Sequence, residues 1–476
     1  MRGGTATPWA SRMHCCVDRL STLPDEILQH ILSFLRAQEA VRTCVLAQSW
    51  RHVWKLMRQL RITGILTPAS VLGIQKFVRH LFLLRLHELT ESPLDLCEII
   101  FHEFDDENIA FIKIWIKWAI MCKIQTFHLD LFREHMISHD DKPLISSHLT
   151  KIQLSGLMLS ESFADFSRCS VLQDLQIVRC DLSEVRKLMS PSLKFLVITE
   201  CTSAQNSRLR ICVPHLVSLH LDEPSMDRIP LLESMPELVE AYVQTYWNMD
   251  SCSSFEPMDC NHIMGSSSFS DSDTDDDEVS SSYDADRDIV NSVLGSLSQA
   301  TNLTLLSGDT MYIFGRDLRW CPTFMKLKSL LLNDYWSDAT YCRALACILE
   351  HVPVLEKLSI IFSRKVDPNY KLEIPNYKLE IKGCLDDGAM KRSLTISQYL
   401  KIIQVKCNMV NERFLKLLKF LQSSLNIYCK QKMDDPYGYT VSILNNRKAS
   451  AEVLLYLNVA ASTTITAVRQ AAAAEK

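Results

Sequence analysis

A short apolar phrase that returns at a nearly constant interval places the strongest constraint on the fold of this chain. The phrase consists of an apolar residue, two others, a second apolar residue, one other, and a third apolar residue. It begins at Ile124, Leu149, Leu172, Leu193, Leu216 and Leu238, at intervals of 25, 23, 21, 23 and 22 residues. Because alternate residues of a strand point to the same face, each phrase predicts a strand with one apolar face. An interval of this length leaves room for one crossover, so successive strands are expected to run parallel.

The interval lies within the range of about 20–29 residues that is typical of leucine-rich repeats. We therefore expect an α/β repeat fold over residues 123–249, in which parallel strands form a curved leucine-rich-repeat solenoid. The phrase resumes more loosely at Ala300, Leu327, Leu355 and Leu400. The repeats are therefore expected to continue over residues 289–393, and a helical pattern at 341–351 indicates that one crossover is helical.

Residues 250–288 interrupt the repeats with a different composition. They contain twelve acidic residues, eleven serines and one arginine, with almost no aliphatic side chains. Such a segment cannot bury enough apolar surface to offset the entropy of ordering it, so we expect a disordered insertion. Ser270, Ser272 and Thr274 are each followed by acidic residues, which is typical of phosphorylation sites for acidic-directed kinases. A solvated spacer without regulation is the other interpretation of this segment.

Residues 18–54 contain three helix signals in a short stretch. Pro24 fits the first turn of a helix, where no backbone N–H is needed. Five apolar residues then recur at helical spacing, with Gln29, His30 and Ser33 opposite, and we expect them to share one buried face. These five are Ile27, Leu28, Ile31, Leu32 and Leu35. A module of about 40 residues is near the lower limit of independent stability, so a partner surface is plausible here.

The order of residues in this module carries a family resemblance. The segments LPDEIL (23–28), ILSFL (31–35), RTCVL (42–46) and WRxxW (50–54) resemble the F-box of plant F-box proteins with leucine-rich repeats. The resemblance implies an F-box over residues 18–60 that docks onto a Skp-type adaptor and, through it, onto a cullin–RING ubiquitin ligase. It also implies which residues face the adaptor or hold its docking helices: Leu23, Pro24, Ile27, Leu28, Ile31, Leu35, Val41, Val45 and Trp50.

The remaining segments complete the expected division of the chain. Residues 1–17 are expected to be a disordered N-terminus. Residues 61–122 form a linker that leads into the repeats, and helical spacing over 71–89 predicts a helix there. Residues 394–429 resemble the FBD region that ends many plant F-box proteins with leucine-rich repeats. Neither the phrase nor a family likeness continues over residues 430–476, which we interpret as a divergent tail.

Charge and apolar patterning exclude several classes of partner. The chain has 51 Lys and Arg against 56 Asp and Glu, a net charge of −5, which favours neither nucleic acid nor a membrane surface as a partner. No apolar run is long enough to cross a bilayer, and residues 1–17 lack the apolar core of a secretory signal. We therefore expect an intracellular protein, in the nucleus, the cytoplasm or both.

The cysteine pattern indicates reduced thiols rather than disulfides or a metal site. Many of the 17 cysteines lie inside apolar runs, where a thiol behaves as a small hydrophobic group. The nearest grouping that resembles a metal site is Cys252, Cys260 and His262, which has no second pair of ligands. We therefore expect no metal and no cofactor.

The sequence contains no recognisable catalytic motif. It has no phosphate-binding loop, no nucleophile elbow, no HExxH helix and no RING-type array of Cys and His. We therefore expect a non-catalytic adapter: the substrate-recognition subunit of an SCF-type (Skp–cullin–F-box) E3 ubiquitin ligase, whose repeats bind a target protein of unknown identity. The alternative is an interaction scaffold without a ligase role, because Arg36 and Gln48-Ser49 depart from the proline and the basic pair that the family often has.

Overall fold

The computed structural model of the chain describes residues 20, 22–66, 71–88, 94–104, 108–132, 137–138, 143–203, 208–223, 230–245, 292–307, 314, 318, 321–337, 342–362, 399–407, 417, 421, 427–435, 438–445 and 452–457. The chain divides into two compact units, unit 1 over residues 1–130 and unit 2 over residues 131–476.

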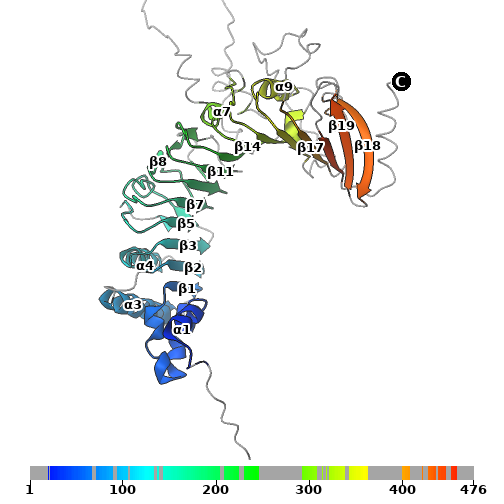
Figure 1. Ribbon diagram of the computed structural model, residues 1–476. Coiled ribbons are helices and arrows are strands. Elements are labelled where there is room, and N and C mark those ends of the chain that lie inside the picture. The colour runs from blue at the N-terminus through cyan, green and yellow to red at the C-terminus, as the bar shows by residue number, and fades with distance from the viewer. Residues whose placement is uncertain are drawn as a thin grey trace, which may run out of the picture. The chain divides into compact units, whose positions relative to one another are not determined.

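Unit 1 begins with short helical elements (Figure 1). They are α1 (Asp25–Leu32), α2 (Ala37–Arg42) and the 3₁₀ turns η1 (Thr43–Val45), η2 (Gln48–Trp50) and η3 (Val53–Leu56). α1 packs against η3, and α2 packs against the first strand of the unit. The core of this module consists of Leu28, Leu32, Ala37, Ala40, Trp50, Val53, Trp54 and Met57. The second of the three helix signals thus becomes α2 followed by η1, and the third, which is too short for a regular α-helix, becomes η2 and η3.

Three parallel strands and two longer helices complete unit 1. The strands β1 (Gln59–Leu66), β2 (Leu96–Phe104) and β3 (Thr126–Phe132) are neighbours in that order. The helices α3 (Val71–Glu88) and α4 (Ile109–Met121) are the crossovers between them, and the predicted helix over 71–89 is confirmed. The helices pack on each other and on the sheet, with Phe82 and Trp118 5.8 Å apart and Phe101 and Trp115 5.4 Å apart between ring centroids.

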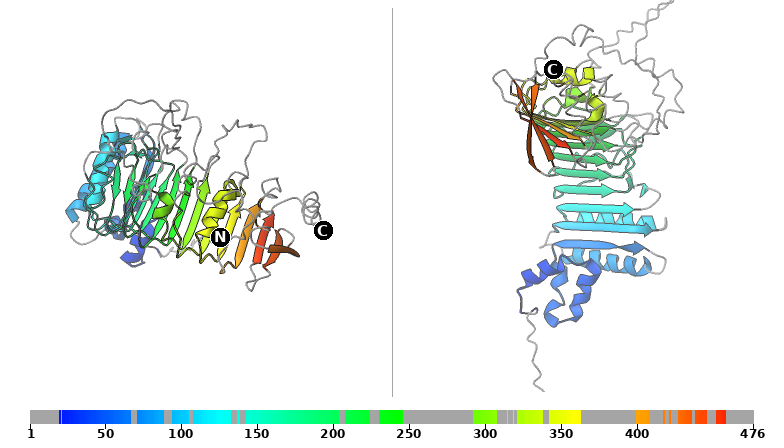
Figure 2. Two further views of the ribbon diagram at one scale, coloured as in Figure 1. Left: turned by 90° about the horizontal axis from the view of Figure 1, so that it is seen from above. Right: turned by 90° about the vertical axis from the view of Figure 1, so that its right-hand side faces the viewer.

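Unit 2 contains a large parallel sheet, which confirms the expected α/β class and the expected parallel strands. Figure 2 shows its strands side by side and pointing the same way. In sheet order they are β5 (Lys151–Ser155), β7 (Asp174–Val178), β9 (Phe195–Thr199), β11 (Ser218–Glu223), β13 (Glu240–Thr245), β14 (Asn302–Ser307), β15 (Ser329–Asn333), β16 (Lys357–Ile361), β17 (Ile402–Cys407) and β20 (Glu452–Leu457).

The repeated phrase sets the register of this sheet. The middle apolar residue of each phrase is the partner of the middle residue of the next phrase, and all of these side chains are buried. The row runs Ile152, Leu175, Leu196, Leu219, Ala241, Leu303, Leu330, Leu358 and Ile403. β13 pairs directly with β14, so the sheet continues across the acidic insertion. The insertion itself lies outside the described residues.

Shorter elements lie between the main strands of unit 2. The strands β8 (Lys187–Met189), β10 (Arg210–Cys212) and β12 (Leu231–Leu232) form a second small parallel sheet, and β4 (Ile137–Ser138) pairs with β6 (Leu157–Met158). The helices α7 (Val293–Ser296) and α9 (Cys342–Glu350) and the turn η7 (Asp334–Ser337) fill later crossovers. The helix predicted at 341–351 is therefore confirmed as α9.

The C-terminal part of the chain carries strands that the repeat phrase does not reveal. β18 (Ile427–Asp435) and β19 (Gly438–Asn445) form an antiparallel hairpin, and β20 pairs in parallel with β17. Part of the segment that we interpreted as a divergent tail therefore extends the sheet. In the register that pairs with β17, Val453 and Leu455 take the second and third positions of the phrase, but the residue three positions before Val453 is Ser450, which is not apolar.

Gly156 lies in close contact with the backbone of Leu131. Its φ is +77°, and a Cβ atom added there would lie 1.7 Å from the carbonyl oxygen of Leu131. Only glycine tolerates both the left-handed backbone and this contact. The turn after β5 therefore depends on this one residue.

Candidate functional site: an exposed apolar set on the N-terminal helices

The backbone at Pro24 starts α1. Its carbonyl accepts hydrogen bonds from the N–H groups of Ile27 and Leu28 at 3.0 and 3.1 Å. At the other end, the Ser33 hydroxyl donates to the carbonyl of His30 at 2.6 Å, which competes with continuation of the helix. α1 therefore spans just over two turns, and its side chains form two separate rows.

One row of α1 is core and the other is exposed, which corrects the expectation of a single buried face. Leu28 and Leu32 are 0% exposed, whereas Ile27 is 46% and Ile31 38% exposed. Ser33, expected on the opposite side, is buried. The five apolar positions span a wider arc than the small core of this module can cover, so the Ile27 and Ile31 row remains outside it.

Further large apolar side chains are exposed close by in the sequence. Val45 is 82% and Leu46 69% exposed at the end of η1, and Phe34 is 60% exposed just after α1. We call the exposed apolar set the six residues of this kind between positions 20 and 46: Leu20, Ile27, Ile31, Phe34, Val45 and Leu46. Exposed large apolar side chains are candidates for contact with a partner, and six of them fall within this one short segment.

Hydrogen bonds between residues close in sequence hold the backbone of this module. The Thr43 hydroxyl donates to the Ala40 carbonyl at 2.7 Å, and the Trp54 indole N–H donates to the Arg51 carbonyl at 3.1 Å. The Arg36 N–H donates to a carboxylate oxygen of Glu39 at 3.3 Å at the start of α2. These bonds fix α2 and the 3₁₀ turns, so the exposed side chains project from an ordered frame.

The nine residues that the F-box resemblance singled out divide into three classes. Pro24, Ile27, Ile31 and Val45 are exposed; Leu23, Leu35 and Val41 are partly exposed; Leu28 and Trp50 are buried. Leu20, Phe34 and Leu46 belong to the exposed apolar set but were not among the nine. The sequence could have indicated Phe34 and Leu46, because each is a large apolar residue just beyond the end of a helical pattern.

Other predicted sites lie elsewhere. Ser270, Ser272 and Thr274, and the grouping of Cys252, Cys260 and His262, lie outside the described residues. Within the part of the chain that the structure describes, Cys321, Cys347 and His351 of unit 2 are a group of side chains that could hold a metal ion, and the sequence did not indicate it. In that same part, no helix is long and apolar enough to cross a membrane.

Comparison with known proteins gives this surface a family context. The F-box domain model matches residues 20–61. An F-box protein of Arabidopsis thaliana is 28% identical over 46% of this chain and 60% of its own length. An FBD-associated F-box protein of the same plant is 27% identical over 47% of the chain and 63% of its length. The chain thus covers less than two thirds of the length of these relatives.

A third Arabidopsis relative, an F-box/FBD/LRR-repeat protein, matches nearly end to end. It is 23% identical over 94% of this chain and 97% of its own length. The matched F-box region contains α1, α2, the three 3₁₀ turns and all six residues of the exposed apolar set. This chain therefore carries an F-box domain, and its relatives are F-box/LRR-repeat and FBD-associated F-box proteins of Arabidopsis.

Proposed function

We propose that this chain is the substrate-recognition subunit of an SCF-type E3 ubiquitin ligase. In this proposal the F-box docks on a Skp-type adaptor, and unit 2 binds the target protein. The observation that carries it is the exposed apolar set, which lies within the F-box match and is separate from the core of that module. Burial of these side chains against a partner would be favourable at roughly 25 cal/mol per Å² of apolar surface.

The exposure of each site residue supports a division of roles. Pro24, Ile27, Ile31 and Val45 are accessible to an adaptor, so we assign them direct contact. Leu28 and Trp50 are 0% and 5% exposed, so we assign them the positioning of the helices that make contact. Leu23, Leu35 and Val41 are partly exposed and lie between these roles. Phe34 and Leu46 join the contact group on the same argument from exposure.

We further propose that unit 2 is a leucine-rich-repeat solenoid. The strands from β5 to β13 lie at intervals of 21 to 23 residues and pair in parallel and in one register, which supports this assignment. One row of each strand is the buried apolar row. The alternate row is only partly covered and includes Gln153, Gln176, His220 and Tyr242, with the rings of His220 and Tyr242 stacked 4.2 Å apart. We assign target binding to this second row.

In this proposal the chain performs no bond chemistry itself. F-box proteins are in general non-catalytic adaptors, and ubiquitin transfer would be done by the partner ligase. An adaptor raises the effective concentration of the target, because it holds target lysines beside the ubiquitin-loaded conjugating enzyme. Such a role needs two separate binding surfaces on one chain, and the exposed apolar set of unit 1 and the half-covered strand row of unit 2 supply candidates for both.

A capture experiment with the full chain tests adaptor docking. We expect the wild type to bind a recombinant plant Skp homologue. The double variant Ile27→Asp/Val45→Asp should lose at least about tenfold in affinity, because two charges would replace apolar side chains that the adaptor would bury. Leu23→Ala/Pro24→Ala should also bind more weakly. Ile145→Asp is the matched control, since Ile145 is 57% exposed but belongs to unit 2. Circular dichroism should show all variants folded.

The alternative function predicts a different result. If Arg36 and Gln48-Ser49 prevent adaptor docking, the wild type and the double variant would bind the Skp homologue equally poorly. In that case the chain would be an interaction scaffold without a ligase role. Restoring the residues that the family often has, with Arg36→Pro and a basic pair at 48–49, would then be expected to create binding.

A further inference from the structure

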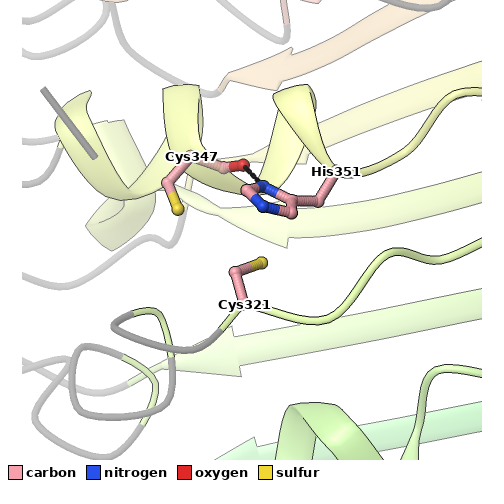
Figure 3. Close-up of side chains that lie close together, drawn as sticks. All are labelled: Cys321, Cys347 and His351. Carbon is pink, nitrogen blue, oxygen red and sulfur yellow. Dashed lines mark hydrogen bonds between the residues drawn. The ribbon is translucent and has the colours of Figure 1, made fainter. Parts of the chain in front are cut away.

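Two consecutive crossovers of unit 2 bring two thiols and an imidazole together. Cys347 lies on α9, and His351 follows one turn later at its end. Cys321 lies on the extended segment before β15. The ligand atoms of the three side chains all lie within 4.8 Å of one another (Figure 3). Residues separated by 26 positions in the sequence therefore meet at one point.

The imidazole of His351 is held with one nitrogen toward the sulfurs. Its Nδ1 lies 2.7 Å from the backbone carbonyl oxygen of Cys347, which can only accept a hydrogen bond, so Nδ1 carries the proton. In the neutral ring, Nε2 then has the lone pair. Figure 3 shows Nε2 on the side of the ring that faces the two sulfur atoms. A carbonyl bound to one ring nitrogen is a frequent way of orienting a histidine whose other nitrogen binds a metal.

We propose that Cys321, Cys347 and His351 bind one Zn²⁺ ion. Thiolate sulfur and imidazole nitrogen are the preferred ligands of Zn²⁺, whereas Mg²⁺ and Ca²⁺ prefer oxygen. Zinc holds such atoms in a tetrahedron at bond lengths of roughly 2.0–2.3 Å, so ligand atoms lie about 3.5–3.8 Å apart. The ligand atoms now lie within 4.8 Å of one another, and side-chain rotation at Cys321 and Cys347 can bring them to these distances. Water occupies the fourth position.

The binding step balances through two protons. Each thiol loses its proton to solvent as the sulfur bonds to Zn²⁺, and His351 binds through Nε2 without a proton change. No oxidant or reductant is needed. The weak hydrogen bonds that the sulfurs now donate, from Cys347 to the Leu318 carbonyl at 3.7 Å and from Cys321 to the Pro322 carbonyl at 3.8 Å, would be lost.

Bound Zn²⁺ would cross-link two segments of unit 2. Zn²⁺ would join the segment before β15 to the helix before β16, which are otherwise held by packing and by a backbone bond from Phe324 to the His351 carbonyl at 2.8 Å. The inference is independent of the ubiquitin-ligase proposal, because it concerns these side chains alone.

Cobalt is a suitable probe, because Co²⁺ occupies zinc sites and its bonds to thiolates give a charge-transfer absorption band. We expect the reduced full chain to show this band at one equivalent of Co²⁺, and Zn²⁺ to displace it. Cys321→Ser and His351→Gln should each lose most of the band. Cys212→Ser is the matched control, because Cys212 is also partly exposed but lies outside the cluster, and it should retain the band.

Thermal unfolding tests the same proposal without relying on the cobalt absorption band. Zn²⁺ binding to the native state should raise the Tm of the wild type and of Cys212→Ser, and should leave the Tm of His351→Gln unchanged. Two outcomes would overturn the proposal. One is a charge-transfer band that survives in Cys321→Ser and His351→Gln, since other thiols would then bind the cobalt. The other is absence of the band together with a Cys321–Cys347 disulfide under mild oxidation, which would make this a redox pair.

Discussion

Helix α1 and strand β9 both carry a row of aliphatic side chains on one side, but this row is exposed in α1 and buried in β9. In α1, Ile27 and Ile31 lie four residues apart on one side and are 46% and 38% exposed. In β9, Leu196 and Ile198 lie two residues apart on one face and are both 0% exposed. Spacing predicts which side chains share a face in both regions. It predicts burial only in the sheet, where each repeat brings the crossover that covers its own strand.

The first prediction tests this contrast directly by removing similar side chains from the two regions. Leu196→Ala should lower the free energy of unfolding by about 2–5 kcal/mol, because it leaves a cavity in a fully buried row. Ile31→Ala should change it by less than about 0.5 kcal/mol, because Ile31 is already in contact with solvent. Urea unfolding followed by circular dichroism would measure both.

Adaptor affinity provides the reciprocal control for that pair. Ile31→Ala should weaken binding to the Skp homologue, whereas Leu196→Ala should leave it unchanged at temperatures where unit 2 is folded. Equal destabilisation by the two variants would contradict the contrast, since it would place Ile31 in a core.

The sheet was the more predictable region for a physical reason. The apolar phrase occurs ten times in the sequence. Leu175 and Leu330 are each the middle residue of a phrase, so the sequence alone could place them in one buried row. β20 was not predicted, because in the register that pairs with β17 the first position of the phrase is Ser450, so the apolar pattern there is incomplete. The strands β1 and β2 were also missed, since the long helix α3 separates β1 from β2 and the helix α4 separates β2 from β3, which places these strands at intervals outside the repeat.

The candidate sites were less predictable because each depends on exposure or on contacts distant in sequence. Helical periodicity placed Ile27 and Leu28 on one face, although their exposures are 46% and 0%. Which of two adjacent positions meets the core depends on where η3 packs, and periodicity does not contain that information. Cys321 and His351 meet only because consecutive crossovers of unit 2 stack, so no local pattern could reveal the cluster.

A carboxylate in each unit offers a second, smaller test of burial. Glu98 of β2 lies 3.5 Å from the Arg61 guanidinium and 3.3 Å from His128 Nδ1, and all three side chains are at most one-third exposed. Glu356 lies 2.7 Å from the Lys401 ammonium, but both side chains are more exposed. Glu98→Gln should therefore cost about 1–3 kcal/mol, because it leaves a partly buried guanidinium without its counter-ion.

Glu356→Gln is the matched control in unit 2. Salt and solvent screen an exposed ion pair, so no measurable change in Tm is expected, although the Lys401 hydrogen bond holds the pKa of Glu356 below its usual range. Raising the salt concentration should leave the Glu98→Gln penalty largely intact. A Glu356→Gln variant that lost as much stability as Glu98→Gln would show that burial does not set the difference.

The smallest expected effect concerns the half-covered strand row of unit 2. Burial lowers the pKa of His220, and the nearby Asp222 carboxylate only partly opposes this shift. As the pH falls through about 6.5, the unfolded chain therefore takes up a proton at His220 before the native chain does, and acidification reduces stability.

His220→Gln removes this contribution, so its Tm should fall less than that of the wild type between about pH 7.5 and about pH 5.5. The two proteins differ only at position 220, so the difference between the two slopes isolates His220. If Tm falls equally with pH in the two proteins, burial does not act on His220 beside Tyr242. The assignment of this strand row as a half-covered binding face would then lose its support.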